Sequence, residues 1–134
     1  MIFKGEYLNG EKNGYGKEYN MEGKLIFEGE YINGEKNGKG KEYWFNGDLS
    51  FEGEYINGER NGKGKEYFYG ELIFEGEYLN GMRWNGKGKE YGKITFEGEY
   101  LNGKRNGYGK EYDNEYKLIF EGKFLNEEKI NKGN

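Results

Sequence analysis

The stretch FEGEYINGERNGKGKEY, residues 51–67, decides the fold because it contains two strand patterns separated by turn residues. Its first half alternates Phe51, Gly53 and Tyr55 with acidic residues, and a two-residue period is that of a β-strand with one apolar face. The two Asn-Gly pairs that follow, at residues 57–58 and 61–62, are expected to supply the positive-φ backbone conformations of a tight reversal. Apolar residues do not recur at helical spacing, and so many glycines would destabilise a helix. The stretch therefore predicts a β-hairpin.

The same pattern recurs six times, so the chain is predicted to be a repeat array. The equivalent phenylalanines are 22–24 residues apart, and the variable lengths fall in the connectors between repeats. The fourth repeat carries an insertion within residues 80–86. The sixth decays, and its second strand is not recognisable, which is typical of a capping repeat. The repeats begin at Phe3, Phe27, Phe51, Phe74, Phe96 and Phe120, and residues 1–134 are predicted to form a single repeat domain.

Alternation also predicts which side chains share a face of the sheet. In the second strand, strict alternation would place Glu42 on the aromatic face, so we predict a one-residue bulge near Lys41 that returns Tyr43 to that face. Glutamate columns are expected to alternate with lysine columns, which keeps like charges apart. For the first strand, one face is expected to carry Leu25, Phe27, Gly29 and Tyr31, and the other Glu28 and Glu30.

The composition indicates a folded protein with an aromatic core. The chain has 14 Tyr, 9 Phe and 2 Trp, and each ring can bury roughly 150–250 Å². A net charge of −4 with interspersed signs provides no attraction toward nucleic acid or an anionic bilayer. The apolar runs are too short to span a membrane, and no secretory signal is recognisable. We therefore expect a cytoplasmic protein, or a piece whose flanking segments are missing.

Catalysis is not expected from this set of residues. The paired carboxylates, such as Glu52 and Glu54, recur in one environment, whereas acid–base catalysis needs carboxylates with different pKa values. The chain has no His and no Cys, so soft-metal ligands and the usual activated nucleophiles are missing. The glycine-rich residues 62–65 recur as hairpin geometry, without the helix of a phosphate-binding loop. We predict no enzyme activity, cofactor or metal. An enzyme that uses Glu and Tyr on a carbohydrate or nucleotide is kept as the last alternative.

Two sets of aromatic residues are candidates for contact with a partner. One set recurs in each repeat, and a single-layer sheet cannot cover both of its faces, so these rings are expected to form the core and also to line a groove. The other set breaks the repeat, and Trp and Tyr are frequent at interface hot spots. The recurring candidates are Tyr31, Tyr55, Tyr78 and Tyr100; the repeat-breaking candidates are Trp44, Phe45, Phe68, Tyr69, the non-aromatic Met82, Tyr116 and Trp84, the last of which is expected in a turn.

The pattern F-E-G-E-Y-x-N-G-x-x-N-G-x-G resembles the MORN repeat, usually written as aromatic-x-Gly-x-aromatic, then N-G, then G-x-G. The resemblance extends from Phe3 to about Asn126. The chain differs in having Tyr where the second aromatic residue is usually Trp, and Asn where His often precedes G-x-G. The resemblance implies an all-β fold: an elongated, twisted, single-layer antiparallel sheet of about six hairpins with a curled, aromatic-lined groove.

The resemblance also implies scaffolding or peptide binding, with membrane association in some members and antitoxin or immunity-type roles for similar bacterial repeats. Our first hypothesis is a non-enzymatic module that binds a protein or peptide in the aromatic groove, as a scaffold or as an inhibitor or antitoxin. The alternative is a membrane-associated structural protein that binds phospholipid, which the mixed charges disfavour. An idealised consensus array is a further alternative. The open first and last strands also leave room for an end-to-end homodimer.

Overall fold

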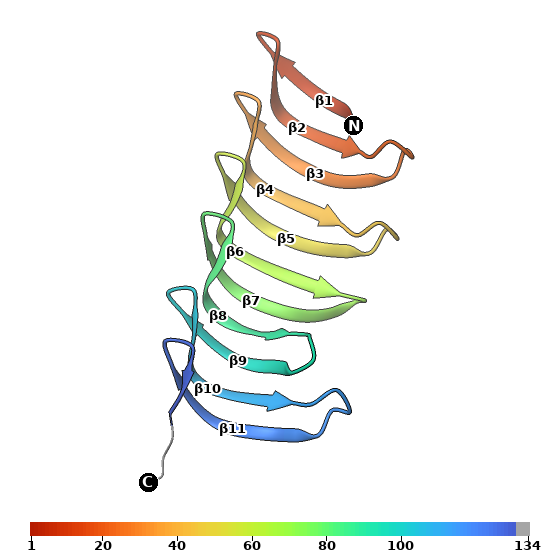
Figure 1. Ribbon diagram of the computed structural model, residues 1–134. Coiled ribbons are helices and arrows are strands. Elements are labelled where there is room, and N and C mark those ends of the chain that lie inside the picture. The colour runs from red at the N-terminus through yellow and green to blue at the C-terminus, as the bar shows by residue number, and fades with distance from the viewer. Residues whose placement is uncertain (131–134) are drawn as a thin grey trace.

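The computed structural model describes residues 1–130, and the twelve strands in that part of the chain form one antiparallel sheet. Each strand pairs with the next in sequence, so the hairpins follow one another from the first to the last like steps (Figure 1). The predicted single-layer sheet of stacked hairpins is therefore confirmed. None of the described residues forms a helix long and apolar enough to cross a membrane. The strands are β1 (Ile2–Leu8), β2 (Glu11–Tyr19), β3 (Leu25–Ile32), β4 (Glu35–Tyr43), β5 (Leu49–Ile56), β6 (Glu59–Phe68), β7 (Glu71–Leu79), β8 (Met82–Glu90), β9 (Thr95–Leu101), β10 (Lys104–Tyr112), β11 (Leu118–Leu125) and β12 (Glu128–Lys129).

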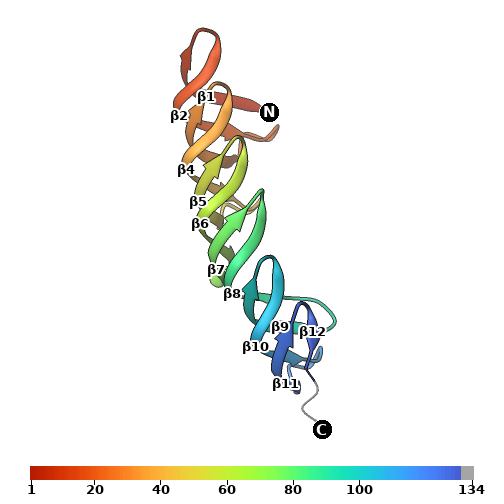
Figure 2. The same ribbon diagram turned by 90° about the vertical axis from the view of Figure 1, so that its left-hand side faces the viewer.

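The hairpin tips lie along one side of the sheet and the connectors between repeats along the other (Figure 1). At a typical tip, Asn33 and Gly34 have φ values of 51° and 86°, and positive φ at both central residues is the geometry of a type I′ turn. The Gly34 N–H donates to the carbonyl of Lys12 at 2.8 Å, and the equivalent bond recurs at the later tips. These bonds hold the tips in a row, which faces the viewer in Figure 2.

The second Asn-Gly pair of a repeat forms a bulge instead of a turn. In the third repeat, residues 61–63 lie opposite the single residue Glu54. Gly62 takes a φ of 96°, and the Glu54 carboxylate accepts the N–H of Lys63 at 2.7 Å. Because a bulge bends the strand that contains it, each hairpin curves between its tip and the rest of its length (Figure 1).

The core is a double column of rings on one face of the sheet, which we call the aromatic face. Phe51 contacts Tyr55 of its own repeat and Tyr78 of the next edge-to-face, with ring centres 5.7 and 5.1 Å apart. Glycine makes room for the rings, because a Cβ on Gly64 would lie 2.7 Å from the Phe51 ring. The guanidinium of Arg60 lies 4.1 Å from the centre of that ring and covers it. The buried rings are Phe27, Tyr31, Phe51, Tyr55, Phe74, Tyr78, Phe96, Tyr100 and Phe124.

The opposite face, which we call the charged face, carries the predicted ladder of acidic and basic residues. Lys41 lies between Glu28 of its own hairpin and Glu52 of the next repeat. Each pair of opposite charges across neighbouring strands contributes roughly 0.2–1 kcal/mol to the stability of the sheet. The alternation is broken at the first strand pair, where Lys4 lies opposite Lys17.

The predicted bulge that would return Tyr43 to the aromatic face is wrong. Glu42 lies opposite Phe51 on the aromatic face, whereas the Tyr43 hydroxyl donates to Glu28 on the charged face. The register does shift after Glu42, but the extra residue belongs to the neighbouring strand, where Ser50 is passed over. The side chains of β4 keep their strict alternation between the two faces, because the Glu42 carboxylate accepts hydrogen bonds from Arg60 and Tyr55 on the aromatic face.

The same kind of shift corrects the predicted pattern of the first strand. Phe27 lies opposite Glu18, but Leu25 lies opposite Tyr19, so Ile26 is the extra residue. Directly opposite residues of an antiparallel pair share a face. Leu25 therefore lies on the charged face with Tyr19, and not beside Phe27 as predicted.

The fourth repeat combines one inserted residue with a bulge that is one residue smaller, and together these shift the register by two residues. One extra residue, Trp84, bulges from β8, whereas the other complete hairpins have two extra residues at this point. The rest of β8 is consequently displaced by two residues along β7, so Phe74 lies opposite Gly88, whereas Phe51 lies opposite Glu66. A displacement of two, unlike one, keeps each side chain on its face. Trp84 therefore lies in a strand, and its predicted place in a turn is wrong.

The sixth repeat does begin a second strand, contrary to the prediction. The chain reverses at Asn126 and Glu127, whose φ values are 48° and 77°. Glu128 and Lys129 then pair with the end of β11. Glu127 occupies the position that is Gly in the other tips, so the Asn-Gly pair that indicates a turn is missing from the sequence here.

Candidate interaction surface

Glu–Tyr–Arg groups connect neighbouring repeats on the aromatic face. The Glu42 carboxylate accepts two hydrogen bonds from Arg60, from Nε at 3.0 Å and from Nη2 at 2.9 Å, and one from the Tyr55 hydroxyl. Burial acts to raise the pKa of Glu42, but the bonds from Arg60 and Tyr55 and the positive charge of Arg60 outweigh it, so the pKa is lowered. Burial and the bond to Glu42 raise the pKa of Tyr55. The equivalent groups are Glu66–Tyr78–Arg83 and Glu90–Tyr100–Arg105.

These groups give the recurring tyrosines a structural role. The exposed fractions of Tyr31, Tyr55, Tyr78 and Tyr100 lie between 2% and 7%. In the groups of Tyr55, Tyr78 and Tyr100, the lowered carboxyl pKa and the raised phenol pKa leave the carboxylate ionised and the phenol protonated near neutral pH, a pairing that suits a fixed hydrogen bond. A molecule that lies on this face would first contact the Arg and Glu side chains. Direct contact between a partner and these four rings stays a prediction, which their burial does not favour.

Exposed aromatic side chains gather on the connector side of repeats two to four. The ring centre of Phe68 is 6.0 Å from that of Trp44, 4.6 Å from that of Tyr69 and 5.8 Å from that of Tyr91. Their exposed fractions are 44% for Trp44, 38% for Phe68, 76% for Tyr69 and 41% for Tyr91. We call these four residues the connector cluster.

Hydrogen bonds hold the connector cluster in place. The indole N–H of Trp44 donates to the carbonyl of Tyr67 at 3.0 Å, and the hydroxyl of Tyr91 donates to Glu71 at 2.8 Å. Tyr91 reaches Glu71, at the start of β7, because β8 is displaced by two residues. The insertion at Trp84 therefore determines where the last ring of the cluster lies.

A depression of about 460 Å³ opens beside the cluster, lined by Trp44, Phe68 and Tyr91 together with Arg60 and Glu66. Arg60 donates to Glu42, and Glu66 accepts from Arg83 and Tyr78. The charged groups of the depression are thus already paired, and the rings remain available for apolar contact. A volume of this size lies within the roughly 300–1,000 Å³ of small-molecule pockets and accommodates side chains of a partner.

Phe45 and Trp84 lie apart from the connector cluster. Phe45 is 67% exposed, and the ammonium of Lys24 lies 4.9 Å from the centre of its ring. Trp84 is half-buried on the tip side, where a Cβ on Gly103 would lie 3.2 Å from the indole ring. The sequence analysis did not identify Tyr91, since it occupies a regular repeat position. The insertion at Trp84, which precedes Tyr91 in the sequence, was the feature that could have indicated its altered position. Of the repeat-breaking candidates, the structure brings together Trp44, Phe68 and Tyr69.

The charged face is the other open surface. A depression of about 560 Å³ runs over paired glycines between two charged columns, with Glu28, Glu30, Lys39 and Lys41 among its lining residues. Because the signs alternate from strand to strand, this face presents no extended field of one sign for a polyanion. Among the described residues, no group of three metal-ligating side chains is placed to hold a metal ion.

The stacked hairpins, the shared core between repeats and the exposed rings at one side define a β-hairpin repeat array that presents surfaces for binding. The family model of the MORN repeat matches residues 3–24, 27–49, 51–70 and 96–114. The chain belongs to the MORN repeat family, as the resemblance in the sequence predicted. Repeats of this family are non-enzymatic modules that interact with proteins or membrane lipids. No curated protein matches the chain.

Proposed function

We propose that this protein is a non-enzymatic binding module that holds a protein partner at the connector cluster. The observation that carries the proposal is the contact of Phe68 with three other exposed rings at the connector side of the array. Exposed aromatic patches mark interaction sites, and Trp and Tyr are frequent among hot-spot residues. Since hydrogen bonds already hold Trp44 and Tyr91, binding would cost little further side-chain entropy.

The proposed partner inserts an aliphatic or aromatic side chain into the depression beside Trp44, Phe68 and Tyr91. Because Arg60 and Glu66 in the depression are already paired with other side chains, the edges of the rings are the favourable contacts for an apolar side chain of the partner. A scaffold would hold this partner next to another protein, whereas an inhibitor or antitoxin would block the partner's own activity. We therefore propose one binding mode for both roles, and the identity of the partner distinguishes them.

The test is affinity capture from native lysate followed by calorimetry with the purified partner. Trp44→Ala removes one ring of the cluster. Tyr69→Asn removes another and suits the positive φ of 50° at this turn position, where Asn is well tolerated. Phe45→Ala is the matched control, because Phe45 is an exposed ring on the same side but outside the cluster. Circular dichroism and thermal unfolding verify the fold of each variant.

We expect a stoichiometric partner whose affinity falls about tenfold or more in the double variant Trp44→Ala, Tyr69→Asn, with no change in the Phe45→Ala control. Equal binding by the wild type and the double variant would overturn the proposal. Vesicles that contain phosphatidylserine provide the second arm. Cosedimentation with vesicles that is lost in the double variant, without a protein partner, would favour the membrane-lipid alternative instead.

A further inference from the structure

Strand β1 forms an edge of the sheet with an unusual charge. Within the part of the chain that the structure describes, β1 has one neighbour, β2. The interior repeats carry Glu at the position of Lys4, for example Glu28 and Glu52. Lys4 instead lies opposite Lys17, a like-charge pair that is unfavourable across neighbouring strands. The ammonium of Lys4 lies 5.4 Å from the ring centre of Tyr19.

The array follows one pairing rule that a further strand would also have to follow. Glycine lies opposite glycine from strand to strand, as Gly5 does with Gly16 and Gly40 with Gly53. Within a hairpin the backbones approach closely, since a Cβ on Gly5 would lie 2.6 Å from the Cα of Gly16, and at the boundary between repeats the rings fill the space over the paired glycines, since a Cβ on Gly40 would lie 2.6 Å from the Phe27 ring and 2.9 Å from the Tyr55 ring. Any strand that continues the sheet beyond β1 in the same way would therefore place a glycine opposite Gly5.

We propose that β1 of a second copy of this chain is that strand, which makes a two-fold symmetric dimer with one continuous sheet. With Gly5 opposite Gly5 of the second copy and the strands antiparallel, Lys4 of each copy lies opposite Glu6 of the other. Two pairs of opposite charge then flank the glycine pair, as Lys39–Glu54 and Lys41–Glu52 flank Gly40–Gly53 within the chain. A Glu at position 4, as in the interior repeats, would instead place Glu opposite Glu.

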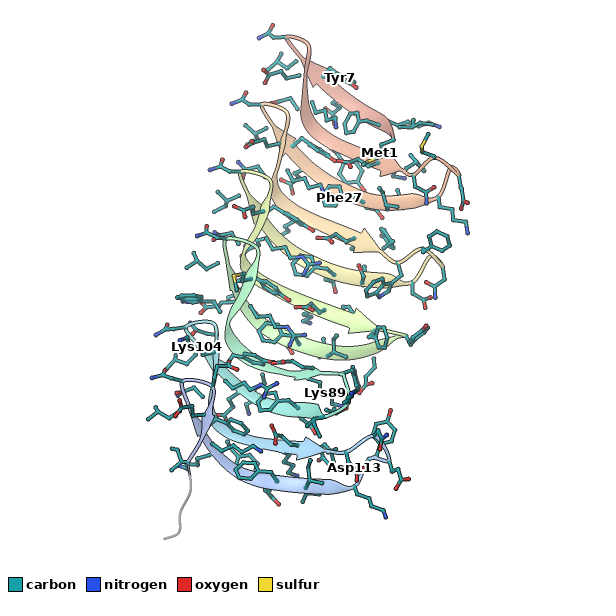
Figure 3. All side chains as sticks on the ribbon, in the orientation of Figure 1. Met1, Tyr7, Phe27, Lys89, Lys104 and Asp113 are labelled. Carbon is teal, nitrogen blue, oxygen red and sulfur yellow. The ribbon has the colours of Figure 1, made fainter. Side chains whose placement is uncertain are left out.

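The apolar residues of β1 support the same register. Tyr7 is 59% exposed, whereas the equivalent tyrosines of repeats two to five are buried against a ring of the preceding repeat, as Tyr31 is against Phe3 at 5.1 Å. Ile2 and Leu8 are 52% and 59% exposed. In the proposed pair, Phe3 lies opposite Tyr7 of the second copy and Ile2 opposite Leu8. Figure 3 shows Tyr7 on the outermost strand, where this contact would form. The two-fold axis is perpendicular to the sheet, so the aromatic faces are continuous across the dimer.

Sedimentation equilibrium of the full chain and of two charge variants tests the proposal. Lys4→Glu gives a strand with Glu at both positions, and Glu6→Lys gives a strand with Lys at both. Each variant alone places like charges opposite each other in both pairs, so we expect its dimer dissociation constant to rise about tenfold or more. An equimolar mixture restores both opposite-charge pairs, and we expect it to form a heterodimer with an affinity near that of the wild type.

Fold controls accompany these variants. Lys4→Glu places opposite charges at positions 4 and 17, so its melting temperature should not fall below that of the wild type when both are measured at concentrations low enough to be monomeric. Glu6→Lys removes an acceptor of the Tyr15 N–H, now at 3.1 Å, so circular dichroism must show that the variant is folded. A wild type that stays monomeric at high concentration, or a mixture that dimerises no better than its components, would overturn the proposal. A series of ever larger oligomers would also contradict it, because pairing of β1 with the other end of the sheet does not close.

Discussion

Arg60 and Glu42, eighteen residues apart in the chain, are joined by two hydrogen bonds of 3.0 and 2.9 Å across the boundary between the second and third repeats. A planar guanidinium can form both bonds at once while its face covers an aromatic ring, and Arg60 does so over Phe51. The Tyr55 hydroxyl donates to the same carboxylate. A polar group in the core thus couples one repeat to the next, because its donors come from the following repeat.

Removal of the Glu42 carboxylate should therefore destabilise the array. Glu42→Ala leaves the Arg60 guanidinium and the Tyr55 hydroxyl without their acceptor. Because the two charged side chains keep exposed fractions of 26% and 28%, the expected loss is about 2 kcal/mol in the free energy of unfolding, less than for a deeply buried pair. Urea denaturation measures it. Glu35→Ala, at an exposed strand position, is the control, with an expected change below about 0.5 kcal/mol. Equal effects of the two substitutions would contradict this role of Glu42.

The paired glycines under the rings should not tolerate a methyl group. A Cβ on Gly40 would lie 2.6 Å from the Phe27 ring and 2.9 Å from the Tyr55 ring, so Gly40→Ala should cost about 1–3 kcal/mol through overpacking. Gly92 lies in a connector, where the nearest heavy atom to an added Cβ is the Ile94 carbonyl oxygen at 3.6 Å. Gly92→Ala should be neutral, or stabilising by up to about 1 kcal/mol, because it restricts the unfolded chain. Thermal unfolding of both variants tests whether crowding or backbone freedom decides the outcome.

Deletion of Trp84 should restore the regular register of the fourth repeat. Without the extra residue, the bulge can take the form seen in the third repeat, and β8 then moves back by two residues. In wild-type numbering, Phe74 would lie opposite Glu90 instead of Gly88. Cross-strand nuclear Overhauser effects between Phe74 and its neighbour on β8 report the register directly. If Phe74 remains opposite Gly88, the insertion is not the cause of the displacement.

The stability of the array should fall at alkaline pH. Burial and the neighbouring carboxylates raise the pKa of the recurring tyrosines, Tyr31, Tyr55, Tyr78 and Tyr100. The unfolded chain has an ordinary tyrosine pKa of about 10, so the native state holds these protons more tightly. The contribution to stability is therefore complete below about pH 10 and is lost as the pH rises above it.

Urea midpoints measured from neutral to strongly alkaline pH, together with tyrosinate absorbance, follow this loss. The double variant Tyr55→Phe, Tyr78→Phe removes two of the titrating groups and should show a smaller decrease between about pH 10 and 12. An equally steep decrease in this variant would show that other groups cause the alkaline transition.

Local patterns in the sequence determined the repeats, the two-residue alternation, the type I′ turn at Asn33 and Gly34 and the ladder of charges. Each of these follows from period and turn chemistry within a few residues. The same reasoning identified Trp44, Phe68 and Tyr69 as residues that break the repeat, although it did not bring them together.

Only the tertiary structure decided that Glu42 lies on the aromatic face, that Trp84 displaces β8 and that Tyr91 joins the connector cluster. The physical reason is the same in each case: the deciding partner belongs to another strand or repeat. Glu42 is accepted in the core because Arg60 of the next repeat donates to it, and Tyr91 reaches the cluster because the register between β7 and β8 has shifted. Side-chain pairing across repeats and strand register depend on contacts distant in the chain, which no local pattern specifies.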